Sequence, residues 1–170
     1  MFTFRRGLLV ASLLVAAPLN TQAQAPDLGI AISEATVRGS FVLPDGRGLP
    51  EGRGGVASGE TLFNRHCLSC HGLAGQGGIN DALAGGQGSL TTTVPMKTIG
   101  SYWPYTTTLF DYIGRAMPYT TPGILEPDEV YSITAYLLHV NGIITDDASV
   151  DSRSLPEIRM PNRDGFDSAF

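Results

Sequence analysis

Residues 67–71 read Cys-Leu-Ser-Cys-His, a C-x-x-C-H pattern. Two thiols three residues apart share one face of a helical turn. Each thiol can form a thioether with one vinyl group of a haem, and His71 then projects from the same turn toward the iron. The chain has no other cysteine, so no thiol is left for a disulfide. The spacing therefore predicts one covalently attached haem c, held by Cys67 and Cys70, with His71 as an axial ligand.

Two other uses of a C-x-x-C pair agree less well with the sequence. A thioredoxin-like redox couple needs a βαβ context, whereas glycine-rich segments without a strand pattern flank this pair. A structural zinc site needs four ligands, and besides the thiols the chain offers only His66, His71 and His139. Haem attachment is the favoured interpretation.

The amino terminus predicts a signal peptide over residues 1–23. Arg5 and Arg6 are followed by an apolar run at 8–17, which is too short to cross a bilayer. Cleavage after Ala23 would release a periplasmic protein, and no second long apolar stretch predicts a membrane span.

The charge balance argues against several partner classes. The formal net charge is −5, and removal of Arg5 and Arg6 would make it −7. Lys97 is the only lysine. The sequence therefore argues against nucleic acid or an anionic membrane as partner, and against a lysine-ringed docking face.

Composition divides the remaining chain into three parts. Residues 24–56 are rich in glycine and proline and predict an irregular arm. Residues 57–142 carry the helical patterns and predict an all-α haem domain. Residues 143–170 contain six acids, three arginines and two prolines, and predict an extended tail. Such arms are either disordered or clamp a partner subunit.

Three helices are expected in the haem domain. Ser58 is a candidate N-cap for a helix over 59–65 that leads to the haem motif. A second helix, 106–116, should stop at Met117-Pro118. A third, 127–140, begins with Pro127 and ends at Asn141-Gly142.

Two further expectations concern side chains and loops of this domain. Phe63 and Tyr136 are expected to form the contact between the first and last helices. Seven glycines between residues 72 and 88 predict a loop around the haem edge.

Four residues after the haem motif could supply the sixth iron ligand. Met117 is favoured because it lies between two helices and Pro118 stiffens the loop after it. Met96 is the alternative, while His139 and Met160 are weaker candidates. A thioether ligand favours ferrous iron and fills the coordination sphere, which suits electron transfer rather than peroxide chemistry.

Several blocks together resemble a class I c-type cytochrome, namely residues 67–72, 100–105, 109–113, 116–118 and 128–131. More narrowly, with residues 46–54 and 155–166, the chain resembles the cytochrome subunit of the sulfur-oxidising (Sox) sulfane/sulfite dehydrogenase. The resemblance implies a class I cytochrome c-like haem domain with His71 and Met117 as axial ligands. It favours a propionate-binding role for Tyr102 or Trp103.

The same resemblance implies a partner and a role. The electron donor would be a molybdenum-cofactor dehydrogenase subunit, and the acceptor a downstream cytochrome or oxidase. The chain would then carry electrons and would not be catalytic alone. The Sox subunit can carry a second haem domain, whereas this chain has one C-x-x-C-H motif. Service to another periplasmic dehydrogenase is the alternative. A haem enzyme acting on a small sulfur compound or peroxide is less favoured, because no third cysteine is present.

Overall fold

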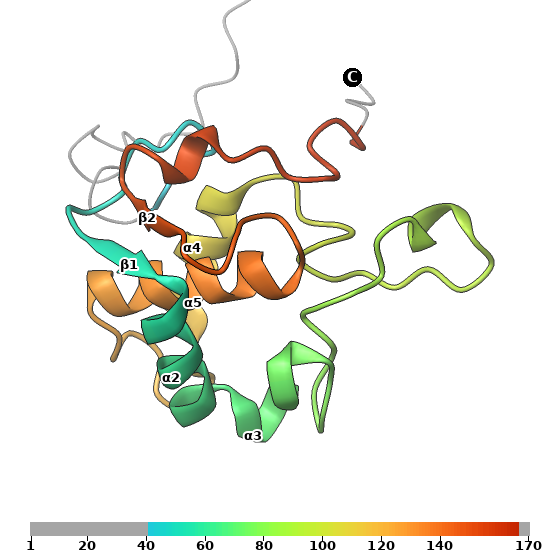
Figure 1. The fold of residues 1–170 in the computed structure, drawn as a ribbon, viewed down its shortest axis with the longest axis horizontal. Helices are drawn as coiled ribbons and strands as arrows, with labels where there is room; N and C mark the ends of the chain where they lie inside the picture. The colour runs from blue at the N-terminus through green and yellow to red at the C-terminus, as the bar shows by residue number, and fades with distance from the viewer. Residues whose placement is uncertain (1–40, 167–170) are drawn as a thin grey trace, which may run out of the picture. The chain divides into compact units, whose positions relative to one another are not determined.

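The computed structural model describes residues 41–166. The predicted signal peptide, residues 24–40 of the arm and residues 167–170 lie outside this range. Within it the chain forms four α-helices, two short strands and three 3₁₀ turns (Figure 1). These are β1 (Arg53–Gly55), α2 (Val56–His66), α3 (Leu68–His71), η1 (Leu73–Gly75), η2 (Ser89–Thr91), α4 (Thr106–Ala116), α5 (Pro127–Val140), β2 (Ser149–Asp151) and η3 (Leu155–Glu157).

The bounds of α4 and α5 confirm the predicted helices. Pro127 occupies the first turn of α5, and the Glu126 backbone N–H donates to the Glu129 carboxylate at 3.0 Å. At the other end Gly142 adopts a φ of +69°, and the Ile143 N–H donates to the Leu138 carbonyl at 3.0 Å. This C-terminal turn is the one that the Asn-Gly pair predicted.

The predicted start of α2 is wrong. The helix begins at Val56, directly after β1, and Gly55 is its N-cap without a side-chain hydrogen bond. Ser58 lies inside the first turn, where its hydroxyl donates back to the Gly55 carbonyl at 2.9 Å. The strand leads directly into the helix, and the first N–H of the helix, that of Val56, donates to the Ala148 carbonyl at 3.3 Å in place of a capping side chain.

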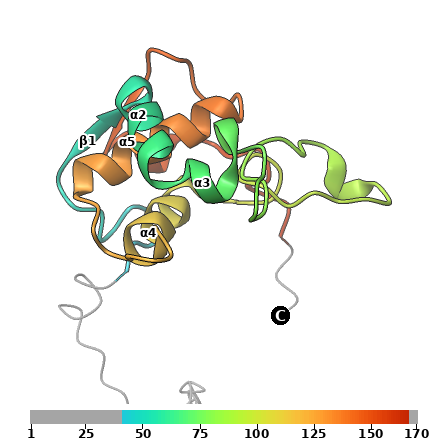
Figure 2. The same cartoon turned by 90° about the horizontal axis from the view of Figure 1, so that it is seen from below.

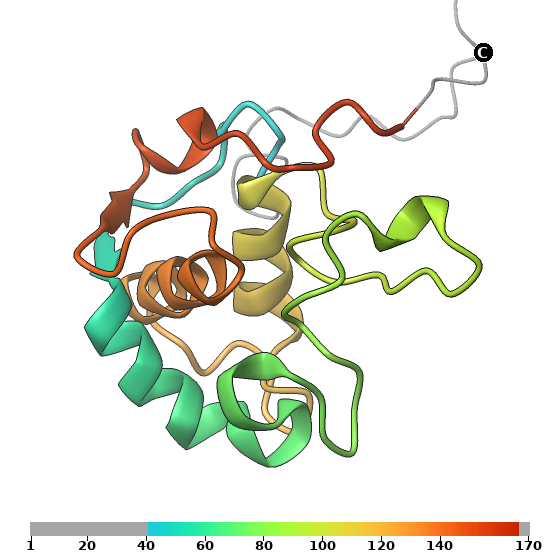
Figure 3. The same cartoon turned by 45° about the vertical axis from the view of Figure 1, so that its right-hand side comes forward.

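The core forms where α2 and α4 pack against α5, which lies between them in Figure 3. The Phe63 and Tyr136 rings are 5.3 Å apart, centroid to centroid, which confirms the predicted contact between α2 and α5. Phe110 of α4 packs against Tyr131 of α5 at 4.4 Å. Nine successive residues of α5, 130–138, are buried. The all-α expectation is confirmed, since the strands are only three residues long.

The two arms meet in a small antiparallel sheet (Figure 1). Gly54 of β1 lies opposite Val150 of β2. Val150, Leu155 and Met160 are buried and belong to the domain's own core. The sequence offered disorder or a partner clamp for the tail. Over 149–160 the tail is ordered against its own domain, because its scattered apolar residues act as single anchors that periodicity does not reveal. A clamp on a partner subunit stays a prediction.

Within residues 41–166, no helix combines the length and the apolar character that a membrane span requires.

Candidate haem-attachment site

The C-x-x-C-H residues form one continuous helical turn between α2 and the end of α3. The Cys67 N–H donates to the Phe63 carbonyl at 2.8 Å, so the motif is tied to the last turn of α2. The N–H groups of Cys70 and His71 both donate to the Cys67 carbonyl, at 3.1 and 2.9 Å. Both thiols are free and half-buried. The structure thus brings Cys67, Cys70 and His71 together as the spacing predicted.

The chemistry of the thiols argues against a redox couple or a zinc site. Burial, followed by the neighbouring Cys70, raises the pKa of Cys67 to about 11. A catalytic C-x-x-C pair instead holds one thiol at a lowered pKa. Among residues 41–166, no three His, Cys, Asp or Glu side chains lie close enough to hold a metal ion. Two half-buried thiols on one turn are the donors that thioether attachment of a haem requires.

His71 is oriented by a backbone group. Its Nδ1 lies 3.0 Å from the Asp81 carbonyl oxygen. A carbonyl only accepts hydrogen bonds, so Nδ1 is the donor in this contact and Nε2 is the nitrogen that could bind a metal. Such a second bond fixes the ring of a metal-binding histidine. The donor set therefore fits a haem iron bound through His71 Nε2.

The loop that carries Asp81 folds back onto α3. The Gly77 N–H donates to the His71 carbonyl at 2.8 Å, and the Asn80 N–H donates to the Cys70 carbonyl at 3.0 Å. Gly72, where the chain turns, has a φ of +72°, and a Cβ there would lie 2.1 Å from the Gly77 oxygen. Glycine is therefore required for this turn. The segment was predicted as a loop, but the role of the Asp81 carbonyl was not.

Asn141 anchors the next part of this loop to the end of α5. Its side-chain oxygen accepts from the Gly85 N–H at 3.1 Å. Its amide nitrogen donates to the carbonyls of Leu83 and Leu137, at 3.2 and 2.8 Å. Sequence reasoning identified Asn141 only as a helix terminator. Beyond this anchor the loop projects away from the helices (Figure 2).

The candidates for the sixth ligand occupy different environments. Met117 is half-buried at the C-terminal end of α4, and its N–H donates to the Ile113 carbonyl at 3.1 Å. Met96 lies on the projecting loop and is 48% exposed. Met160 is fully buried in the core, and His139 Nδ1 lies 3.3 Å from the Ile144 carbonyl oxygen. These positions weaken Met160 and His139 as ligands.

The tail covers the aromatic block before α4. The Asn162 amide donates to the Tyr102 carbonyl at 2.8 Å, and the Arg163 guanidinium lies 4.0 Å from the centre of the Tyr105 ring. Trp103 is half-buried beside them. A propionate-binding role for Tyr102 or Trp103 stays a prediction.

Comparison with known proteins gives the family. The family model described as cytochrome c matches residues 56–141. A chain in the crystal structure of the sulfane dehydrogenase SoxCD from Paracoccus pantotrophus is 42% identical, with a TM-score of 0.75; the match covers 83% of this chain and 72% of that one. A chain of the thiosulfate dehydrogenase TsdBA from Marichromatium purpuratum is 24% identical over 49% of this chain and 17% of that one. Its TM-score of 0.38 is too low to support an argument. The comparison with curated proteins gave no match.

The matched segment runs from the start of α2 to the end of α5, so it contains both the haem motif and Met117. The match confirms the class I cytochrome c-like fold, and the SoxCD match confirms the resemblance to the Sox cytochrome. Covalent attachment of haem c and transfer of electrons are properties of this domain. This chain belongs to the cytochrome c family.

Proposed function

We propose that the chain is a periplasmic monohaem cytochrome that transfers single electrons. One haem c is attached through Cys67 and Cys70, with His71 and Met117 as axial ligands. The haem supplies the one-electron iron couple, and the protein holds the ligands and limits access of water. The electrons come from a molybdenum-cofactor sulfite or sulfane dehydrogenase subunit and pass to a downstream cytochrome or oxidase.

The observation that carries this proposal is the setting of His71. Its Nδ1 bond to the Asp81 carbonyl leaves Nε2 free on the turn that presents both thiols. Met117 supports a closed coordination sphere, because it is half-buried at a helix end on a separate element. Two ligands from the protein leave no open iron position for peroxide chemistry.

The similarity to a chain of the sulfane dehydrogenase SoxCD, 42% identical, supports the choice of donor. The periplasmic location rests on the amino-terminal sequence and on the family's covalent haem. The charge balance also agrees with a dedicated donor. The chain has an excess of acidic residues and a single lysine, so it lacks the ring of lysines with which a general-purpose carrier docks its partners.

The test is expression with the native leader in a bacterium that matures c-type cytochromes, followed by three measurements. Mass spectrometry should show one haem on the peptide that contains Cys67 and Cys70, and an amino terminus after Ala23. The ferric spectrum should show the weak sulfur-to-iron band at its red end. Rapid mixing with a purified sulfite- or sulfane-oxidising molybdenum subunit and its substrate should reduce the haem.

Each measurement can contradict one part of the proposal. A folded chain without haem would refute the haem assignment. High-spin bands would refute methionine ligation. Reduction no faster than that of an unrelated monohaem cytochrome would refute the donor.

A further inference from the structure

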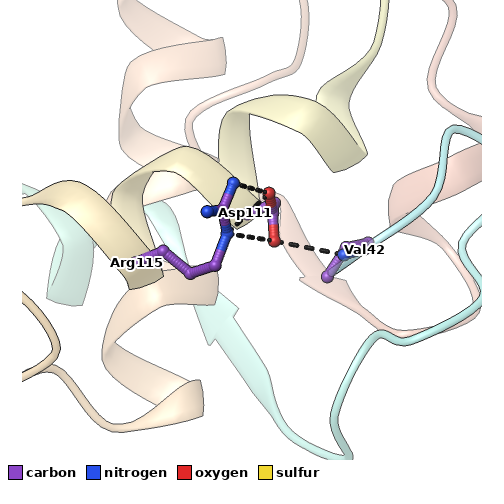
Figure 4. Close-up of polar contacts among 3 residues, drawn as sticks. All are labelled: Val42, Asp111 and Arg115. Atoms are coloured by element: carbon purple, nitrogen blue, oxygen red, sulfur yellow. Dashed lines mark hydrogen bonds and ion pairs between the residues drawn. The ribbon is translucent and has the colours of Figure 1, made fainter. Parts of the chain in front are cut away.

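Residues 42–44 of the amino-terminal arm lie beside α4 and are hydrogen-bonded to it twice. The Val42 backbone N–H donates to Asp111 Oδ1 at 3.1 Å (Figure 4). The Thr107 hydroxyl donates to the Pro44 carbonyl at 3.3 Å. Thr107 and Asp111 are four residues apart, so they lie on the same face of the helix. The arm therefore contacts the helix that ends at Met117.

Asp111 joins this arm to the last turn of α4. Its carboxylate accepts two bonds from Arg115 Nε, at 3.0 and 2.9 Å, and one from Arg115 Nη2 at 2.5 Å (Figure 4). The Asp111 side chain is only 12% exposed, whereas that of Arg115 is 51% exposed. The guanidinium also lies 5.2 Å from the centre of the Phe41 ring. Because the carboxylate is largely buried and accepts all these hydrogen bonds, it contributes more to stability than an exposed ion pair does.

The opposite side of the same turn is held by the core. Ile113 is buried, and its carbonyl accepts the N–H of Met117. The nearest atoms to a Cβ on Gly114 would belong to Val130 of α5, at 3.7 Å. The turn that precedes Met117 is thus fixed by α5 on one side and by the arm, through Asp111, on the other.

We propose that Asp111 is a positioning residue for the sixth iron ligand. By joining Val42 to Arg115 it holds the last turn of α4, and so keeps the Met117 thioether at the iron. Residues 41–44 of the amino-terminal arm then tune the strength of the axial bond between Met117 and the iron without contacting the iron themselves. The inference rests on the proposed ligation by Met117.

The test measures how easily imidazole displaces the thioether from the ferric holoprotein. A loosened methionine competes less well, so in Asp111→Asn the apparent dissociation constant for imidazole should fall about three- to tenfold, as expected for losing a charge-assisted bond of about 1 kcal/mol. The sulfur-to-iron band should also weaken. Arg115→Gln should change both in the same direction, since it removes the other partner.

Two control variants separate this effect from general destabilisation. Asp164→Asn breaks an ion pair with Arg159 whose two side chains are both more than 70% exposed, and it should leave imidazole binding unchanged. Val150→Ala removes core volume in β2, away from α4, and should lower the denaturation midpoint without tightening imidazole binding. Equal imidazole affinity in Asp111→Asn and the parent protein, or equal tightening in Val150→Ala, would overturn the inference.

The same measurements distinguish a failure of the proposed ligation by Met117 from a failure of the positioning role of Asp111. If the parent protein shows no sulfur-to-iron band, methionine ligation is wrong and the positioning role falls with it. If the band is present but insensitive to Asp111→Asn, only the positioning role is wrong.

Discussion

The imidazole of His71 donates to a neutral backbone carbonyl rather than to a carboxylate. A carboxylate partner would increase the electron donation of the imidazole to the iron, whereas a carbonyl fixes the ring with a smaller effect. An imidazole that donates less electron density to the iron stabilises the ferric state less. At the scale of a residue, the Asp81 carbonyl and the proposed methionine ligand would therefore act in the same direction, toward a higher potential.

Replacement of Met117 tests the expected effect of the methionine ligand on the potential. Met117→Ala should lower the midpoint potential sharply and abolish the sulfur-to-iron band, since axial ligands tune haem potentials over about 0.8 V. Protein-film voltammetry and the ferric spectrum measure both. Met96→Ala is the matched control, because Met96 lies exposed on the projecting loop. If the control lost the band and Met117→Ala kept it, the sixth ligand would be Met96.

At the scale of elements, the crossing of α2 and α5 depends on a close approach of their backbones. A Cβ at Gly59 would lie 1.9 Å from the Ser132 carbonyl oxygen and 2.8 Å from Tyr136 Cβ. The two backbones can therefore approach this closely only at a position where α2 has no side chain.

Gly59→Ala should push the two helices apart and destabilise the protein by about 1–3 kcal/mol, the usual cost of overpacking. Gly114→Ala is the control, because its Cβ would make ordinary contacts at 3.7 Å and an alanine in a helix is favoured over glycine by about 1 kcal/mol. Urea unfolding followed by far-ultraviolet circular dichroism compares them. Equal losses in both variants would show that the close approach does not matter.

The elements that the sequence predicted are those with explicit stop signals. Met117-Pro118 and Asn141-Gly142 end α4 and α5 as expected. The strands were not predicted, because three residues such as Arg-Gly-Gly show no alternation.

In the candidate haem site, the grouping of Cys67, Cys70 and His71 on one turn could be predicted, because their spacing in the sequence places them there. The Asp81 carbonyl was not, since any residue has a carbonyl and only the fold of the loop brings this one to His71. The roles of Asp111 and Asn141 depend on contacts between residues far apart in sequence, which no local pattern encodes.

At the scale of the whole described domain, both arms are structural parts of it. The Thr106 hydroxyl donates to the Leu155 carbonyl at 2.6 Å, which joins the tail to the start of α4. The Tyr131 hydroxyl donates to the Pro50 carbonyl at 2.8 Å, which joins the amino-terminal arm to α5. The helices alone would leave these faces uncovered.

Removal of residues 149–170 should therefore unfold the domain rather than only release a partner. The segment contributes buried Val150, Leu155 and Met160. At about 1.5–3 kcal/mol for each buried side chain, the loss is comparable with the total stability of a small domain. Thermal unfolding of the holoprotein measures it. Removal of only the residues after 163 is the control and should change the midpoint little, because Asp164 and Phe166 are exposed. A truncated chain without 149–170 that melts like the parent would contradict this view of the tail.

The pairing of β1 with β2 also bears on the order of events in folding. The pairing joins residues 53–55 to residues 149–151, so it is a contact of very long sequence separation. β2 and the buried Leu155 and Met160 follow all the helices along the chain, so the sheet and this part of the core form only when these residues have joined the helices. Cys67 and Cys70 precede them by many residues. In a chain that has not yet formed this pairing the two thiols are accessible, so the proposed haem attachment can precede the step in which residues 149–160 complete the fold.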